Sequence, residues 1–484
     1  MLNSEIKRNL AKLPTSLLVE FISELHGADK LIDKKIDRLL LQSDKPKFIK
    51  KLTSTIKGLK RRRKFVDYWE SSEFAQELKH LLSDVMTLQE DQPRQCLELL
   101  ELFIASSESS LNRCDDLNGE VGGVYRSLAQ HWLSVAHTCY ELDKAQASIE
   151  EQALLSRAWQ NKVIELAKNN DFGEMDELLS NVGRLLSTEE VMTLIEHYQM
   201  LYNRTLKSKN QDDDDYEVME IAINLENVTK ALGDVELYES IYLQVNKKKA
   251  YNAKKTTLNT LQLEEMIRYF YSQFAYDKAI HYLNKVWISD DNYDEIRRLD
   301  WLITLYEATG DSENKLAVMT EAFEKDPTPQ RLKAILAMVP AEQKPIWREK
   351  ALSLAQQQQN ILKKLRLLLD LDELSLADAA AINAKAQLAT CQYNGLTDLL
   401  KQTPLQAYFT QVIIYRSLLN DILNNARSKA YGHAARYYRQ LYNLDAAIYQ
   451  HGKSYEGIIT HQEYLTALKD KHGKKTTFWA LIDY

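Results

Sequence analysis

Glycine and proline are scarce in this chain, and this scarcity limits its fold more than any other feature. The 484 residues include 14 glycines and 8 prolines, whereas the two together usually make up about 12% of a protein. A β-sheet protein needs a turn after every short strand, and these two residues supply most turns. Long helices need few turns and lose stability when either residue lies inside them. The sequence therefore predicts an all-α fold.

Composition and targeting signals predict a cytoplasmic protein. Hydrophobic residues make up 45% and charged residues 27%, as in globular rather than disordered chains. No stretch approaches the roughly 18 apolar residues of a membrane span, and the first eight residues lack the apolar core of a signal peptide. The four cysteines form no CxxC pair, which disfavours disulfides and zinc. We expect no metal and no cofactor.

The spacing of apolar residues predicts three parts. Residues 1–145 form an N-terminal helical domain, residues 146–405 form tetratricopeptide-like repeats, and residues 406–484 form a basic helical segment. A helical hairpin cannot bury its apolar side alone, so neighbouring hairpins should stack into an α-solenoid with helical caps at both ends.

Two hairpins show the repeat most clearly. Phe274-Ala-Tyr-Asp and Gly310-Asp-Ser-Glu begin 36 residues apart, and each segment joins an aromatic-rich helix to a second helix. Asp326-Pro327 then closes the second hairpin where a tetratricopeptide repeat has its proline. Apolar stripes elsewhere are expected to form the core. They include Leu17, Phe21, Tyr68, Trp69, Leu128, Trp132, Val135 and Cys139.

A glycine-rich segment interrupts the helical pattern once. Three glycines fall within residues 119–123, behind Asp115 and Asp116. An EF-hand alignment on Gly119 places Cys114 and Tyr125 where calcium needs carboxylates, so a calcium loop is excluded. The aspartates are expected to cap the following helix. A functional pocket formed by Asp115 and Asp116 stays an alternative.

Positive charge gathers near both ends of the chain. Residues 1–64 contain 17 Lys/Arg against 7 Asp/Glu, although the whole chain has a net charge of −7. Residues 427–475, which include Arg436, contain 9 Lys/Arg against 4 Asp/Glu. Such clusters could follow nucleic-acid phosphates, or form ordinary solvated helix surfaces. The first excess peaks at Lys60, Arg61, Arg62, Arg63 and Lys64.

Arg427 and His433 are candidates for catalysis, and Asp115 with Asp116 is the other pair that a cryptic enzyme could use. An arginine followed by five residues and a histidine resembles the loose pattern of HEPN-type ribonucleases, which use both side chains at one phosphate. In that pattern a polar Asn, Asp or His usually follows the arginine, whereas Ser428 follows here. A surface or structural role is the competing interpretation.

Several segments together resemble an uncharacterised bacterial family of all-helical proteins. They are Lys64 to Leu82, Cys114 to Gly122 and Ala426 to Ala435. The first two, with the ending Leu468 to Trp479, are similar to the helical portion of bacterial SWIM zinc-finger proteins. The CxC…CxH zinc motif of those proteins is absent here. The resemblance implies a bacterial, cytoplasmic, all-α array and assigns no catalytic residue.

We interpret the chain as a protein-interaction scaffold that binds a partner protein on its solenoid surface. The first alternative is a nucleic-acid-associated protein that uses both basic regions. The second is a cryptic HEPN-like ribonuclease. The sequence specifies no reaction, so an enzyme is disfavoured without being excluded, and no membrane association is expected.

Overall fold

The computed structural model describes residues 4–27, 32–33, 36–37, 40–41, 43–168, 170, 173–208, 216–247 and 258–482. Within these ranges the secondary structure is helical, apart from one isolated parallel bridge between Val66 and Cys114. The predicted all-α array of helical hairpins is confirmed. The chain divides into two compact units, Met1–Leu258 and Asn259–Tyr484. The division at residues 145 and 405 stays a prediction.

The first unit is built around one long helix, α8 (Glu120–Lys144). Helices α5, α6 and α9 contact α8, and buried side chains of α4 to α13 form one core cluster. The predicted stripe from Leu128 to Cys139 is buried in α8. The other helices are α1 (Ser4–Leu10), α2 (Thr15–Leu25), α4 (Lys45–Arg61), α5 (Tyr68–Met86), α6 (Pro93–Ile104), α7 (Ser107–Leu111), α9 (Ile149–Ala167), α10 (Asp176–Ser180), α11 (Thr188–Ser208), α12 (Tyr216–Lys230) and α13 (Val235–Lys247).

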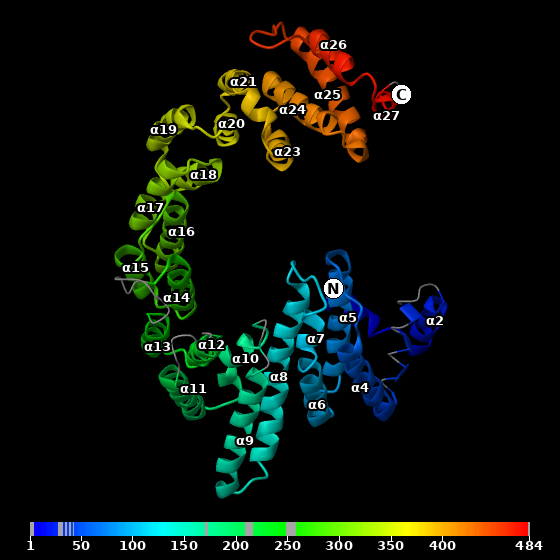
Figure 1. Ribbon diagram of the computed structural model, residues 1–484, viewed down its shortest axis with the longest axis vertical. Coiled ribbons are helices and arrows are strands. Elements are labelled where there is room, and N and C mark those ends of the chain that lie inside the picture. Colours follow the sequence, from blue (N-terminus) through cyan, green and yellow to red (C-terminus); the bar gives the residue numbers. More distant parts are fainter. Residues whose placement is uncertain are drawn as a thin grey trace. The chain divides into compact units, whose positions relative to one another are not determined.

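The second unit begins with a run of helical hairpins. Each pair is joined by a short turn, and its two helices contact each other. In Figure 1, α14, α16 and α18 lie along one side of this run, and α15, α17 and α19 lie along the other. The pairs are α14 (Thr260–Ser272) with α15 (Tyr276–Lys285), α16 (Asn292–Thr309) with α17 (Ser312–Lys325), α18 (Pro329–Met338) with α19 (Lys344–Gln357), and α20 (Ile361–Asp370) with α21 (Leu374–Asn383).

Helix α24 (Tyr408–Asn424) joins the hairpins to the C-terminal helices. Ile413 and Leu418 belong to the core cluster of α17 to α24, and Val412 and Leu419 belong to the cluster of α24 to α27. Apolar residues therefore surround α24 on most sides, which explains why most of its residues are buried. The remaining helices are α22 (Lys385–Ala389), α23 (Tyr393–Gln402), α25 (Tyr431–Gln450), α26 (His461–His472) and α27 (Thr476–Trp479).

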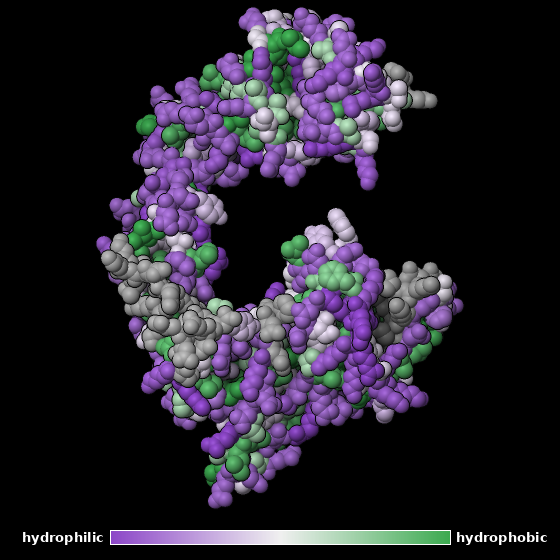
Figure 2. Space-filling view, in the orientation of Figure 1, coloured by the Kyte–Doolittle hydropathy of each residue, from purple (hydrophilic) through white to green (hydrophobic). Residues whose placement is uncertain are grey.

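Some of the expected core residues lie on the surface. Helix α2 contains no buried residue, and Leu17 and Phe21 are exposed. Tyr68 and Trp69 are exposed as well; they lie in the first turn of α5, and the buried residues of this helix begin only at Ser71. The prediction that these residues belong to the core is therefore wrong. The face shown in Figure 2 is mostly hydrophilic, with small apolar patches on both units.

Candidate interaction surface

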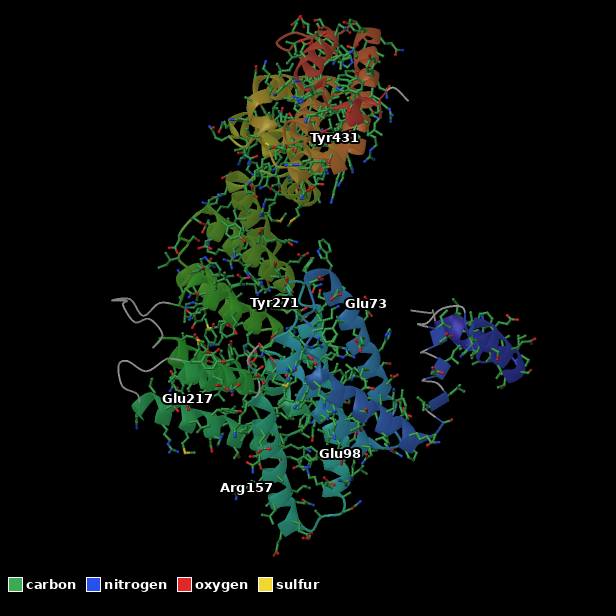
Figure 3. The ribbon with its side chains drawn as sticks, turned by 45° about the vertical axis from the view of Figure 1, so that its right-hand side comes forward. Glu73, Glu98, Arg157, Glu217, Tyr271 and Tyr431 are labelled. Atoms are coloured by element: carbon green, nitrogen blue, oxygen red, sulfur yellow. The ribbon has the colours of Figure 1, made fainter. Side chains whose placement is uncertain are left out.

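Four aromatic residues gather where α14 turns into α15. Tyr271 is the centre of the group, and its position on α14 is labelled in Figure 3. Its ring centroid lies 5.6 Å from that of Tyr276 and 6.1 Å from that of Trp301 on α16. The rings of Phe274 and Tyr276 are 6.1 Å apart, and Phe274 is 77% exposed. We call these four residues the aromatic cluster.

The backbone of Phe274 adopts a conformation that suits glycine. Its φ angle is 59°, in the left-handed region that bulky residues rarely enter. The amide that follows Phe274 donates to the Phe270 carbonyl oxygen at 2.9 Å, which is a helix C-cap bond. In the paired hairpin the amide after Gly310 donates to the Tyr306 carbonyl at the same distance, and the φ angle of Gly310 is 74°. Phe274 therefore occupies the position at which its sister hairpin has glycine.

Charged residues connect α14 and α16 beside the aromatic cluster. Glu264 of α14 accepts hydrogen bonds from Arg268 of the same helix and from Arg297 of α16. The guanidinium carbon of Arg268 lies 5.1 Å from the centre of the Trp301 ring, within the range of a cation–π contact. The aromatic cluster and these ion pairs form one continuous surface, which we call the first-helix face.

The first-helix face continues over α18. Arg331 of α18 donates through both terminal nitrogens to the carboxylate of Asp300 of α16, at 2.7 and 3.0 Å. This bidentate geometry fixes the two helices more firmly than a single contact would. Beyond the N-terminal end of α18, a cavity of about 280 Å³ separates it from α20 and α23.

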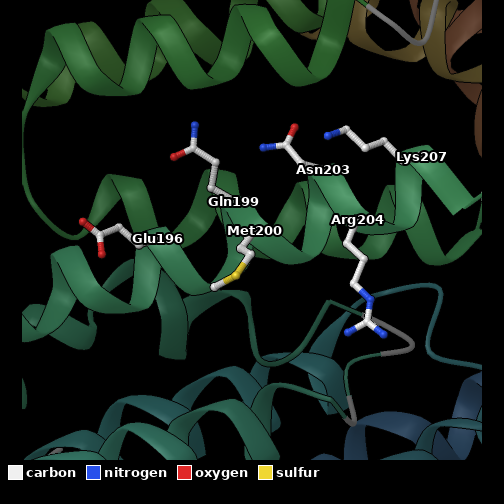
Figure 4. A pocket seen from close by; sticks show the side chains of 6 residues that line it. All are labelled: Glu196, Gln199, Met200, Asn203, Arg204 and Lys207. Atoms are coloured by element: carbon white, nitrogen blue, oxygen red, sulfur yellow. The ribbon is translucent and has the colours of Figure 1, made fainter.

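A larger hollow of about 720 Å³ runs along α11 in the first unit, and Figure 4 shows its side chains. Its lining mixes one carboxylate, two cations and two amides around an exposed methionine, so it indicates no particular reaction. The lining residues are Glu196, Gln199, Met200, Asn203, Arg204 and Lys207.

The structure places Asp116 at the beginning of α8. Its carboxylate accepts hydrogen bonds from the amides of Val121 and Gly122, at 2.9 and 2.7 Å. Asp116 thus caps the first turn of α8, which is the structural interpretation of the glycine-rich segment. The Asp115 amide donates to the Val66 carbonyl at 2.9 Å and ties this loop to the start of α5. A pocket formed by Asp115 and Asp116 stays a prediction, and the described residues contain no group of three potential metal ligands.

The basic run lies at the end of α4 and in the loop that follows. The Arg62 guanidinium donates to the Glu77 carboxylate at 2.8 Å, and the Lys64 ammonium donates to Glu70 at 2.8 Å. Two of the five charges are therefore already balanced by carboxylates of α5, which weakens the attraction for nucleic-acid phosphates. The five exposed basic residues are Lys60, Arg61, Arg62, Arg63 and Lys64.

The side chains predicted for ribonuclease chemistry bond to different partners. The Arg427 guanidinium donates to the Asp421 carboxylate at 2.8 Å. The His433 Nδ1 lies 2.7 Å from a terminal nitrogen of Arg436, on the exposed side of α25. These bonds do not bring Arg427 and His433 together, as a shared phosphate would require. The ribonuclease alternative stays a prediction that no contact in the described part of the chain supports.

Two buried arginines were not predicted from the sequence. Arg113 is 9% exposed, and its guanidinium lies 4.4 Å from the centre of the Phe74 ring. Arg416 of α24 donates to the Ile459 carbonyl at 3.0 Å and lies 4.5 Å from the Tyr464 ring centre. Burial lowers the pKa of both guanidinium groups. Through its hydrogen bond to Ile459, Arg416 holds the segment before α26 against α24, which is a structural role.

The fold and surface define an all-α protein of stacked helical hairpins with an exposed aromatic cluster at the turn from α14 to α15. The chain belongs to a family of unknown function, DUF6880, whose match spans residues 2–481. This agrees with the predicted uncharacterised all-helical family. The relationship to SWIM proteins and the bacterial origin stay predictions.

Other comparisons are distant. No curated protein matches the chain. Among solved structures, a circular tandem repeat protein with novel repeat topology and enhanced subunit contact surfaces is similar at 12% identity and a TM-score of 0.21. The match covers 90% of this chain and 97% of the other. A TM-score this low carries no argument. Within the described residues, no helix combines the length and apolar character needed to cross a membrane.

The aromatic cluster was not predicted as a site, although the sequence contains a signal for it. Aligning the two clearest hairpins places Phe274 opposite Gly310. A bulky residue at a position that favours glycine indicates either strain or function. Which of the two applies depends on whether the ring is buried, and the structure shows it exposed.

Proposed function

We propose that this protein is a non-enzymatic scaffold that binds a partner protein on its first-helix face, with the aromatic cluster as the main contact. The helical-hairpin array supports this proposal, because such arrays present long surfaces built from one helix of each hairpin. The observation that carries it is the exposed Phe274 ring on a left-handed backbone.

The left-handed backbone of Phe274 costs conformational free energy, and contacts within this chain offset little of it. A left-handed conformation costs a residue other than glycine roughly 1–2 kcal/mol. Burial of a phenylalanine ring would offset that cost, but 77% of Phe274 is exposed. Strained residues of this kind persist mainly at functional positions. A partner that covers the ring would supply the missing burial.

The surroundings of the cluster fit a protein interface better than a catalytic pocket. Aromatic side chains are enriched at the centres of such interfaces, and polar groups surround them. Here the aromatic cluster lies beside Arg268 and Arg297, whose two charges are balanced in ion pairs with Glu264 and Asp294. Paired charges form a rim that stays solvated while an apolar centre is covered.

Affinity capture with matched variants tests the proposal. The full-length protein, Phe274→Ala and Tyr449→Ala are immobilised and exposed to lysate of the native host, and the retained proteins are quantified by mass spectrometry. Tyr449 is an exposed aromatic residue of α25 outside the cluster and serves as the control. Circular dichroism establishes that each variant is folded.

We expect wild type and Tyr449→Ala to retain the same partner and Phe274→Ala to retain at least about tenfold less, as for a hot-spot residue. Undiminished retention by Phe274→Ala would refute the assignment of the cluster. A wild-type protein that retains nothing reproducibly would refute the scaffold itself.

A further inference from the structure

The cavity at the N-terminal end of α18 is lined by residues of three helices that are not consecutive in the chain. Thr328 and Gln330 lie at the start of α18, Lys363 and Arg366 come from α20, and Lys401 comes from α23. Its volume of about 280 Å³ is close to the lower limit of small-molecule sites, which is about 300 Å³. The cavity can therefore hold a group of a few heavy atoms.

Positive charge dominates the lining. The side chains of Lys363, Arg366 and Lys401 face one carboxylate in the lining, Asp398. Lys401 contacts Asp398 at 2.9 Å, and Lys363 contacts Asp326 at 2.8 Å at the edge of the site. The Nε of Arg366 is buried and has no hydrogen-bond partner in the described part of the chain. Within the lining, cations thus exceed carboxylates by two.

The backbone adds a donor to the same cavity. Thr328 Oγ1 caps α18 by accepting the Arg331 amide at 3.3 Å, and Pro329 at the first helical position has no N–H. The Leu332 amide donates to the Thr328 carbonyl at 3.1 Å. Within the described residues, this leaves the Gln330 amide as the unbonded donor of the first turn. The first turn of a helix also carries partial positive charge and favours anions.

We propose that this cavity binds a phosphate group. Its donors come from α18, α20 and α23, so they surround a guest from several directions and match the three terminal oxygens of a phosphate better than the two of a carboxylate. A phosphate also brings negative charge to a lining in which cations exceed carboxylates by two, an excess that Asp326 at the edge of the site reduces to one. The proposal is independent of the aromatic cluster and of any protein partner.

Isothermal titration with small probes tests this site in the full-length protein. The probes are inorganic phosphate, phenyl phosphate and acetate, at an ionic strength of about 0.01 M, where screening is weak. The variants are Arg366→Gln, Lys401→Gln and Asp398→Asn. Lys364→Gln is the control, because Lys364 lies on α20 but does not line the cavity. Far-ultraviolet circular dichroism checks the folding of each variant.

We expect phosphate to bind wild type and Lys364→Gln equally. Arg366→Gln should weaken binding at least about tenfold, as the loss of a charge-assisted hydrogen bond does. Lys401→Gln should weaken phosphate binding as well. Because Lys401 is exposed, this variant provides the test if Arg366→Gln does not fold. Asp398→Asn should strengthen binding, because it removes the competing carboxylate. Tighter binding of phenyl phosphate than of inorganic phosphate would indicate that the natural ligand carries its phosphate on an organic group; equal binding would indicate free phosphate.

Three outcomes would overturn the proposal. If wild type binds neither phosphate probe, the site does not exist. If both Arg366→Gln and Lys401→Gln bind phosphate as wild type does, phosphate binds elsewhere on the protein. If acetate binds as tightly as phosphate, the cavity does not select phosphate over carboxylates.

Discussion

The hairpin of α14 and α15 and the hairpin of α16 and α17 each have a left-handed residue at the turn. Substitutions at these two residues measure the backbone strain at Phe274 separately from partner binding. Gly310 follows α16 and Phe274 follows α14, and both have φ angles in the left-handed region, at 74° and 59°. A Cβ atom built at Gly310 meets no other atom within 4 Å. Gly310→Ala therefore adds backbone strain without a steric clash. Phe274→Gly and Phe274→Ala both remove the ring, but only the alanine keeps the strain of a left-handed backbone.

The expected magnitude follows from two opposing effects. A left-handed alanine costs roughly 1–2 kcal/mol relative to glycine in the folded state. Glycine costs about 0.5–1 kcal/mol more than alanine through the entropy that it loses on folding. The difference leaves glycine favoured by about 0.5–1 kcal/mol at either position. Gly310→Ala should destabilise the protein by this amount, and Phe274→Gly should be more stable than Phe274→Ala by the same amount.

Thermal unfolding followed by circular dichroism at the helical band measures both differences. In a unit of about 150–250 residues, 1 kcal/mol shifts Tm by about 2–4 °C, so shifts of about 1–4 °C are expected. The two Phe274 variants should bind the partner equally weakly, because both lack the ring. The reasoning is refuted if Gly310→Ala has an unchanged Tm, or if Phe274→Ala is at least as stable as Phe274→Gly.

Three further predictions concern individual side chains. Asp116→Ala removes the cap of α8 and should lower the free energy of unfolding by about 1–2 kcal/mol in urea titrations, whereas a change below a few tenths would contradict the capping role. The Arg298 guanidinium lies 2.9 Å from Glu295 and lowers the pKa of that carboxyl from 4.5 to about 2. The ion pair should therefore stabilise the fold above pH 4.5, and this stabilisation should be lost as the pH falls towards 2. Glu295→Gln should remove this part of the acid sensitivity, which amounts to at most about 3 kcal/mol. Burial lowers the pKa of His461 below 6.5, so the unfolded chain binds more protons than the folded protein does. The free energy of unfolding should therefore decrease as the pH drops below 6.5. If His461→Leu shows the same pH dependence of this free energy as wild type, the imidazole is not responsible for it.

Local sequence patterns predicted the secondary structure well because helices depend on neighbouring residues. The scarcity of glycine and proline predicted the all-α fold, and the spacing of Leu128 and Trp132 correctly predicted the buried side of α8. Asp116 could be recognised as a cap because capping acts over a few residues. Predictions that depended on packing did less well. Leu17 and Trp69 follow a helical stripe, but nothing in the described structure buries them.

The sequence by itself determined the class of fold, the helical hairpins and the cap at the start of α8, since each depends on interactions within about one helical turn or one hairpin. Only the tertiary structure decided which side chains form a surface together. Lys363 and Lys401 are far apart in the chain and line one cavity because α20 and α23 pack against each other. Phe274 was visible as a departure from its sister hairpin, but its exposure depends on how α14, α15 and α16 pack. The meeting of distant charges is a property of the packed helices, and no local pattern encodes it.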